Sequence, residues 1–243
     1  MVRSHGLANA CAFVLVFAVA AAAPAKTAKA KRIPGKTTFS TPAHSSGSGG
    51  ATSFAPGSGG NSQATTMLFE AVEKGAVDQA SLAIARGASL NERGDAGQTP
   101  LMKAALFGEA DIVRVLLDAG ADATVGEAQG YTPLHGAGFQ GRAEAARVLL
   151  QHKGANKVPN EFHADGFAPL HRACWGKDPR YADTIQAFLD FGVSPSLKTR
   201  PTKPGEDAMT PLELAQRAQN HDSVRVIELA LALEGDKDDE GDL

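Results

Sequence analysis

The most regular feature of the sequence is a pattern of hydrophobic and polar positions that returns about every 33 residues. In the clearest copy, Thr-Pro-Leu-Met-Lys-Ala-Ala-Leu-Phe-Gly at 99–108, apolar residues fall at helical spacing. A second apolar stretch follows at the same spacing and includes Ile112, Val113 and Leu116. Related copies occur at 66–75, 132–141, 168–176 and 210–215. The pattern predicts five units, each a pair of short helices whose apolar face only a neighbouring unit can cover.

Threonine and glycine residues mark where these helices are expected to begin and end. Thr99 and Thr132 precede proline, which suits an N-cap followed by the first helical position, because the hydroxyl accepts a free backbone N–H and proline has none. Gly75, Gly108 and Gly141 lie seven residues after the repeat leucine, where we expect a left-handed helix end. The second helices are expected to end in the same way at Gly87, Gly120, Gly154 and Gly192.

These motifs resemble the ankyrin repeat family, whose pattern combines Thr-Pro-Leu-His, a later turn glycine, and Leu-Leu followed by Gly-Ala. The resemblance extends from Thr66 to Glu234. It implies an all-α ankyrin-repeat solenoid of stacked helix–turn–helix hairpins, preceded by a disordered leader. The implied units are about 66–98, 99–131, 132–167, 168–209 and 210–234. The first and last units lack parts of the motif and are interpreted as caps.

Units three and four depart from the family's pattern. Unit three has one extra residue before Gly154. Unit four places Gly176 one residue early and adds Asp-Pro-Arg at 178–180, so we expect a non-standard turn between its helices. The stretch 194–209 contains three prolines and is long enough to protrude as a loop.

The N-terminal segment has the composition of a targeting sequence. Arg3 precedes an apolar run at 10–23, and small residues follow it, so residues 1–25 resemble a secretory signal peptide. Five basic residues follow the run, and this charge bias favours keeping the downstream side in the cytosol, so an uncleaved short anchor is the alternative. Two interpretations therefore stay open: entry into the secretory pathway or secretion, and a membrane-anchored protein with cytosolic repeats. A membrane is a partner only in the second.

The segments that flank the repeats are expected to be disordered. Residues 26–65 form a basic, Ser- and Gly-rich linker without the apolar surface that a folded core needs. The linker also resembles an organelle transit peptide, which leaves import into a plastid through a bipartite leader as a further alternative. Residues 235–243 form an acidic tail in which like charges repel.

Charge and motif content exclude several classes of function. The residues before Glu70 carry six basic and no acidic side chains, whereas the remainder carries 18 basic and 27 acidic ones. An acidic repeat region without a Lys/Arg stripe argues against nucleic acid as a partner. Phosphate-loop, dinucleotide and zinc-protease patterns are missing. We therefore predict no cofactor and no small-molecule substrate.

Histidine and cysteine residues are the remaining candidates for chemistry. The resemblance implies that His135 and His171 hydrogen-bond within and between repeats, and a metal site would need several convergent ligands. Cys174 lies three residues after His171, but no oxyanion donors or cleft accompany the pair. We therefore expect Cys174 to be part of the core, no metal site, and a protein that is not an enzyme. The other repeat-region histidines are assigned to the surface: His152, His163 and His221.

The positions that the ankyrin family leaves variable and uses for contact are unusually aromatic in this chain. Because large rings dominate interface energetics, we expect a partner-binding patch on the concave face of units two to four. The predicted partner-binding residues are Gln98, Leu106, Phe107, Tyr131, Phe139, Gln140, Phe167, Arg172 and Trp175. The alternative is that the irregular fourth unit buries Phe167 and Trp175 in its own core. The hypothesis is a non-enzymatic module that binds another protein through this face and its loop tips.

Overall fold

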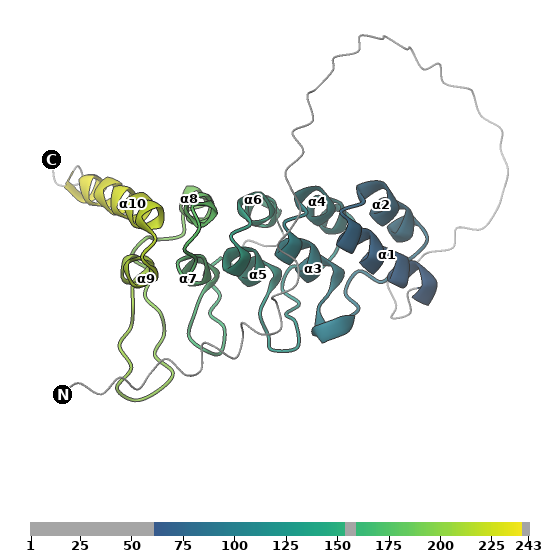
Figure 1. Ribbon diagram of the computed structural model, residues 1–243, viewed down its shortest axis with the longest axis horizontal. Coiled ribbons are helices and arrows are strands. Elements are labelled where there is room, and N and C mark those ends of the chain that lie inside the picture. Colours follow the sequence, from purple (N-terminus) through teal and green to yellow (C-terminus); the bar gives the residue numbers. More distant parts are fainter. Residues whose placement is uncertain (1–60, 154–158, 240–243) are drawn as a thin grey trace, which may run out of the picture. The chain divides into compact units, whose positions relative to one another are not determined.

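The computed structural model describes residues 61–153 and 159–239, which form a stack of helical hairpins (Figure 1). In chain order the helices are α1 (Ser62–Lys74), α2 (Val77–Ala85), the short 3-10 helix η2 (Asp95–Gly97), α3 (Pro100–Phe107), α4 (Ala110–Asp118), α5 (Pro133–Gln140), α6 (Ala143–Gln151), α7 (Pro169–Ala173), α8 (Arg180–Asp190), α9 (Pro211–Ala218) and α10 (His221–Asp239). The predicted leader, the linker up to residue 60 and the turn glycine Gly154 lie outside the described residues.

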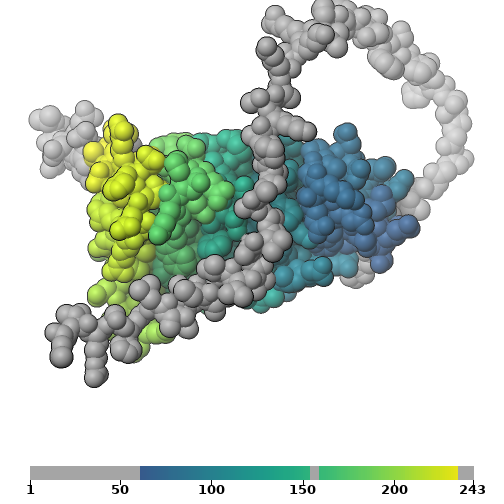
Figure 2. All heavy atoms as spheres, in the orientation of Figure 1, coloured from purple at the N-terminus to yellow at the C-terminus, as the bar shows by residue number. Residues whose placement is uncertain are grey.

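The helices of the stack form two layers (Figure 1). The odd-numbered helices, here called the inner layer, pack in chain order, α1 on α3, α3 on α5, α5 on α7 and α7 on α9. The even-numbered helices form an outer layer in the same order. Long loops project together from the side of the inner layer (Figure 1), and the colours in Figure 2 show the units in chain order along the stack. The predicted all-α solenoid is confirmed.

One apolar core runs through the stack, because each hairpin covers the apolar face of its neighbour. The leucine after each Thr-Pro or its equivalent is buried in the first four units, and these residues are Leu68, Leu101, Leu134 and Leu170. The outer layer adds Ile112, Leu116, Phe188 and Ile227, all fully buried. The apolar residues that recur at helical spacing in the sequence therefore form the contacts between repeats, and the core extends through all five units.

The turns between the paired helices of units one to three use left-handed glycines, as predicted. Gly75, Gly108 and Gly141 end α1, α3 and α5 with φ of 64°, 82° and 65°. Unit five has no glycine at this place, and Gln219 adopts the same conformation with φ of 59°. A side chain at positive φ is strained, because Cβ approaches the neighbouring backbone.

Replacement of Gln219 by glycine should relieve this strain. We expect Gln219→Gly to raise the free energy of unfolding by about 0.5–1 kcal/mol, measured by urea denaturation. The matched control is Gln216→Gly on the exposed side of α9, which should lower it by about 1 kcal/mol because glycine disfavours a helix interior. Equal effects of the two changes would contradict the assignment of strain to Gln219.

Both ends of the stack extend beyond the predicted boundaries. The linker was expected to reach residue 65, but α1 begins at Ser62, because the Asn61 side chain caps it by accepting the N–H of Gln63 at 3.1 Å. The disordered tail was expected from residue 235, but α10 continues to Asp239. Adding residues to an existing helix costs far less than starting one, so the packed part of α10 can propagate into the acidic segment.

Unit four is irregular in the places that the sequence indicated. Its inner helix, α7, has five residues, whereas α3, α5 and α9 have eight. The loop between α8 and α9 is the longest projection in Figure 1, and residues 200–208 are exposed. Its base is tied to the loop before α7, because Arg200 N–H donates to the Gly166 carbonyl at 2.9 Å.

Candidate protein-interaction surface

The nine predicted partner-binding residues differ in exposure. Gln98, Leu106 and Arg172 are buried, at 7%, 6% and 6% exposed, so the expectation that they present themselves to a partner is wrong for these three. Leu106 lies against α5, where Gly136 leaves room for it. The other predicted residues are half-buried, and they are Phe107, Tyr131, Phe139, Gln140, Phe167 and Trp175.

Four of the nine residues meet in one place, around the Arg172 side chain. The guanidinium carbon of Arg172 lies 4.8 Å from the ring centre of Tyr131, 5.0 Å from that of Phe167 and 4.4 Å from that of Trp175. Its Nη2 donates to the Tyr131 hydroxyl at 2.7 Å and to the Asp165 carboxylate. A cation over aromatic faces and a charge-assisted hydrogen bond are both stabilising, so the arginine holds the rings in fixed positions.

Two residues that the sequence analysis did not select complete this group. His163 stacks on the Tyr131 ring with centroids 3.7 Å apart, and its Nε2–H donates to the Gln129 carbonyl at 2.8 Å. The prediction that His163 belongs to the surface is wrong, because its side chain is only 11% exposed. The group is called the Arg172 cluster from here on, and it consists of Tyr131, His163, Asp165, Phe167, Arg172 and Trp175.

The electrostatics of the cluster keep its hydrogen bonds intact near neutral pH. Burial raises the pKa of Tyr131 to about 12, so the hydroxyl stays protonated and donates to Asp165 Oδ2 at 2.7 Å. Burial alone would disfavour the Asp165 carboxylate. The Arg172 charge and hydrogen bonds from Tyr131 and His163 outweigh this effect, so the pKa of Asp165 lies below its usual value.

The irregular turn between α7 and α8 in unit four also supports the candidate surface, through contacts of Tyr181. Tyr181, the second residue of α8, donates its hydroxyl to the Phe139 carbonyl at 3.0 Å. Its ring covers Gly176, where an added Cβ would come within 2.1 Å of the ring, and also contacts Gly141. The turn therefore connects the end of α5, which carries Phe139, to the end of unit four's inner segment, which carries Trp175.

The repeat histidines make the structural hydrogen bonds expected of them. His135 Nδ1 accepts the Thr132 hydroxyl at 2.8 Å, and its Nε2–H donates at 3.3 Å to the Phe167 carbonyl in the loop before α7. His171 accepts the Ala168 N–H at 3.0 Å and donates at 2.8 Å to the Leu197 carbonyl in the loop before α9. These bonds join each inner helix to the loop that leads to the next inner helix.

Cys174 belongs to the core, as predicted. Its side chain is fully buried, and its thiol donates to the Leu170 carbonyl at 3.3 Å. Burial raises the pKa of Cys174 well above its ordinary value, which removes the thiolate that a nucleophile needs. Within residues 61–153 and 159–239, no three His, Cys, Asp or Glu side chains gather to hold a metal ion.

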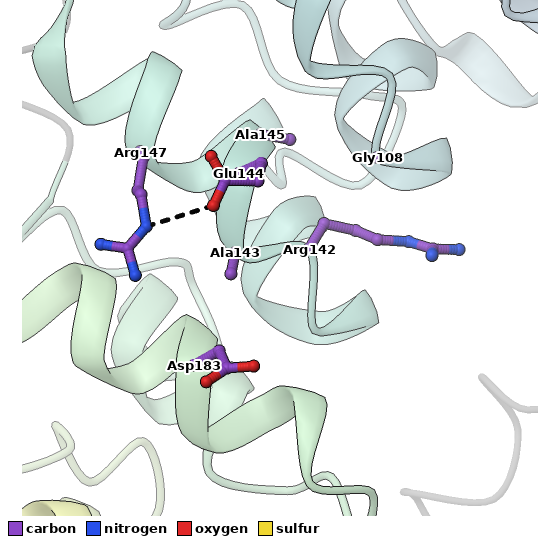
Figure 3. A pocket seen from close by; sticks show the side chains of 7 residues that line it. All are labelled: Gly108, Arg142, Ala143, Glu144, Ala145, Arg147 and Asp183. Carbon is purple, nitrogen blue, oxygen red and sulfur yellow. Dashed lines mark ion pairs between the residues drawn. The ribbon is translucent and has the colours of Figure 1, made fainter. Parts of the chain in front are cut away.

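A separate depression of about 480 Å³ lies at the start of α6 (Figure 3). Its lining is mostly polar, and both of its arginines are engaged: Arg147 pairs with Glu144 and Asp190, and Arg142 Nε donates to the Leu106 carbonyl. None of the nine predicted residues lines it. We therefore place the candidate site at the inner layer and not at this depression. The lining residues are Gly108, Arg142, Ala143, Glu144, Ala145, Arg147 and Asp183.

One sequence signal could have revealed the ion pair of the cluster. In the aligned units, Asp165 takes the place of Gln129, and Arg172 takes the place of Gly136. The segment that leads into α7 and begins it therefore has an acid and a base seven residues apart, both absent from the corresponding segment at α5. Tyr181 and His163 carry no comparable signal, because their partners lie more than 30 residues away.

The fold and this surface define an α-helical repeat protein with a preorganised aromatic face. A family model described as ankyrin repeats (3 copies) matches residues 68–161, which correspond to the first three units. Residues 68–161 of the chain are therefore ankyrin repeats. Units four and five lie beyond the match, and their helices continue both layers of the stack. No curated protein matches the chain. Ankyrin repeats are generally protein–protein interaction modules and typically non-enzymatic.

Proposed function

We propose that this ankyrin repeat protein binds a partner protein through the inner layer of units three and four and the adjoining loops. The observation that carries the proposal is the set of partly exposed rings of Tyr131, Phe139, Phe167 and Trp175 on neighbouring units. Aromatic side chains in such positions are the usual energetic centres of protein interfaces. The proposal includes no catalytic step.

Rigidity of the face supports the same proposal. Phe167 and Trp175 meet edge to face with centroids 4.9 Å apart, and Arg172 fixes both. A partner that docks on preorganised rings loses little additional conformational entropy, so more of the contact energy appears as affinity. The alternative, in which unit four buries these two rings entirely in its own core, is not favoured, because both rings pack against the core but stay partly exposed.

The proposal is tested by identifying the partner and then removing two rings. Proximity labelling with the tagged full-length protein reports its neighbours, and calorimetry measures association with the strongest candidate. The double variant Phe139→Ala, Trp175→Ala should weaken association by about 10- to 100-fold, as expected for aromatic anchors. The matched control replaces exposed apolar residues elsewhere, Leu82→Ala and Phe191→Ala, and should leave association unchanged. The opposite ranking of the two double variants would reject the proposed face.

The compartment in which binding occurs is a separate proposal that rests on the sequence. We propose that residues 1–25 act as a cleaved signal peptide, so that the mature chain begins near Lys26. N-terminal sequencing tests this directly. An intact Met1 or Val2 in a membrane fraction would instead support the tethered scaffold, and a start beyond Phe54 would support plastid import. Within the described residues, no helix has the length and hydrophobicity needed to cross a bilayer.

A further inference from the structure

Arg172 is an unusual residue to find inside this stack. It is 6% exposed, and its Nε is buried without a hydrogen-bond partner in the described residues. The equivalent positions of units two and three hold Lys103, which reaches Glu73 in unit one, and Gly136. A repeat of this kind therefore does not need a buried guanidinium at this place in order to fold.

The free-energy cost of burying a charged group also argues against a purely structural role for Arg172. Desolvating the Arg172 charge costs free energy that its pairing with the partly exposed Asp165 has to offset, and the unpaired Nε adds to the cost. Apolar side chains of similar volume often replace such pairs without loss of stability. A contribution to the stability of the fold therefore does not explain why position 172 holds an arginine.

The contacts of Arg172 explain it better as a link between segments. Tyr131 comes from the loop before α5, Phe167 from the loop before α7, and Trp175 follows α7 itself. These segments are separated by up to 44 residues in sequence, and the planar guanidinium lies within 5.0 Å of the centres of all three rings. A planar cation can lie against several rings and bond a carboxylate in its own plane, which an ammonium group cannot do.

We propose that Arg172 does not contact the partner and is instead a positioning residue, which sets the relative orientation of Tyr131, Phe167 and Trp175 as one recognition surface. This inference rests on the proposed function. It replaces the prediction from sequence that Arg172 itself binds the partner. It also predicts that replacing Arg172 changes the orientation of the rings more than it changes the free energy of unfolding.

The test uses Trp175 as a reporter, since it is the single tryptophan of the chain. Arg172→Met should keep the melting temperature within a few degrees of the parent protein. It should abolish the near-ultraviolet circular dichroism of Trp175, increase its quenching by acrylamide, and weaken partner association about tenfold. Arg172→Lys keeps the charge without the plane, and should give an intermediate Trp175 signal at an unchanged melting temperature.

The matched control is Arg147→Met on α6, which removes an ion-paired arginine from the outer layer of unit three. It should change neither the Trp175 signal nor association. The inference is overturned if Arg172→Met leaves both quantities as they were. It is equally overturned if Arg172→Lys and Arg172→Met lose helicity together with the Trp175 signal, because Arg172 would then be a structural residue only.

Failure of the proposed function would look different. If Phe139→Ala, Trp175→Ala binds the partner as well as the parent does, the proposed face is rejected. The Trp175 measurements on the free Arg172 variants would still report whether the arginine orders the rings.

Discussion

Replacement of Phe188 by alanine is expected to lower the free energy of unfolding by about 3–5 kcal/mol, the largest effect of any change considered. Phe188 is fully buried in α8, which packs between α6 and α10. Removing its ring leaves a cavity that the helices on either side can fill only by moving, so both the lost burial and the cavity contribute. Urea denaturation followed by far-ultraviolet circular dichroism measures the loss.

The helix that carries Phe188 also provides the control. Phe191, directly after α8, is 40% exposed, and Phe191→Ala should change stability by about 0.5 kcal/mol or less. Because each unit of a repeat stack contacts only its neighbours, Phe188→Ala should also separate the unfolding of unit five from that of the earlier units. A single unshifted transition in the Phe188 variant would show that the interface between α6, α8 and α10 is not the assigned one.

The second large effect expected is a loss of stability in mild acid. Burial lowers the pKa of His135 to about 4, whereas an exposed histidine titrates near 6.5. The folded state therefore favours neutral His135, and its contribution to stability is complete above pH 6.5 and declines as the pH falls toward 4. Between pH 7 and pH 5 the expected loss of unfolding free energy from this group is about 2 kcal/mol. Burial also lowers the pKa of His171, which acts in the same direction.

Stability curves at several pH values test this prediction with two variants. His135→Gln keeps a polar side chain near Thr132 but cannot take up a proton, so its stability should change much less between pH 7 and pH 5. His221→Gln removes an exposed histidine and should retain the full acid sensitivity of the parent protein. An unchanged pH dependence in His135→Gln would assign the acid effect to other groups.

Much of the architecture could be predicted from the sequence, because it depends on short-range rules. The Thr-Pro caps, the turn glycines and the helical spacing of apolar residues each act within one turn of a helix or one loop. His135 and His171 could also be assigned, since their partners repeat with the units. The exact ends of the stack could not, because the side-chain cap at Asn61 and the propagation of α10 have no counterpart in the repeats themselves.

The candidate surface was predicted less well than the fold, for a physical reason. Position in the repeat indicates which layer and which side a residue occupies, and this placed Tyr131, Phe167 and Trp175 correctly near one another. Exposure, in contrast, depends on what the adjacent unit supplies. Arg172 is buried because Tyr131, 41 residues earlier, and the rings beside it cover the guanidinium. Such pairs follow from neither periodicity nor local propensity.

The Asn220 side chain, at the start of the last helix, has a consequence for how this array could be shortened or recombined. Its amide donates to the carbonyls of Gly176 and Asp178 at 2.8 and 3.2 Å, while its own oxygen accepts the N–H of Ser223. The Asn220 side chain of unit five therefore supplies hydrogen-bond donors to the turn between α7 and α8 in unit four. In chimeras assembled from single repeats, units four and five should be transferred only as a pair. A foreign last repeat would leave the Gly176 and Asp178 carbonyls without their Asn220 donor.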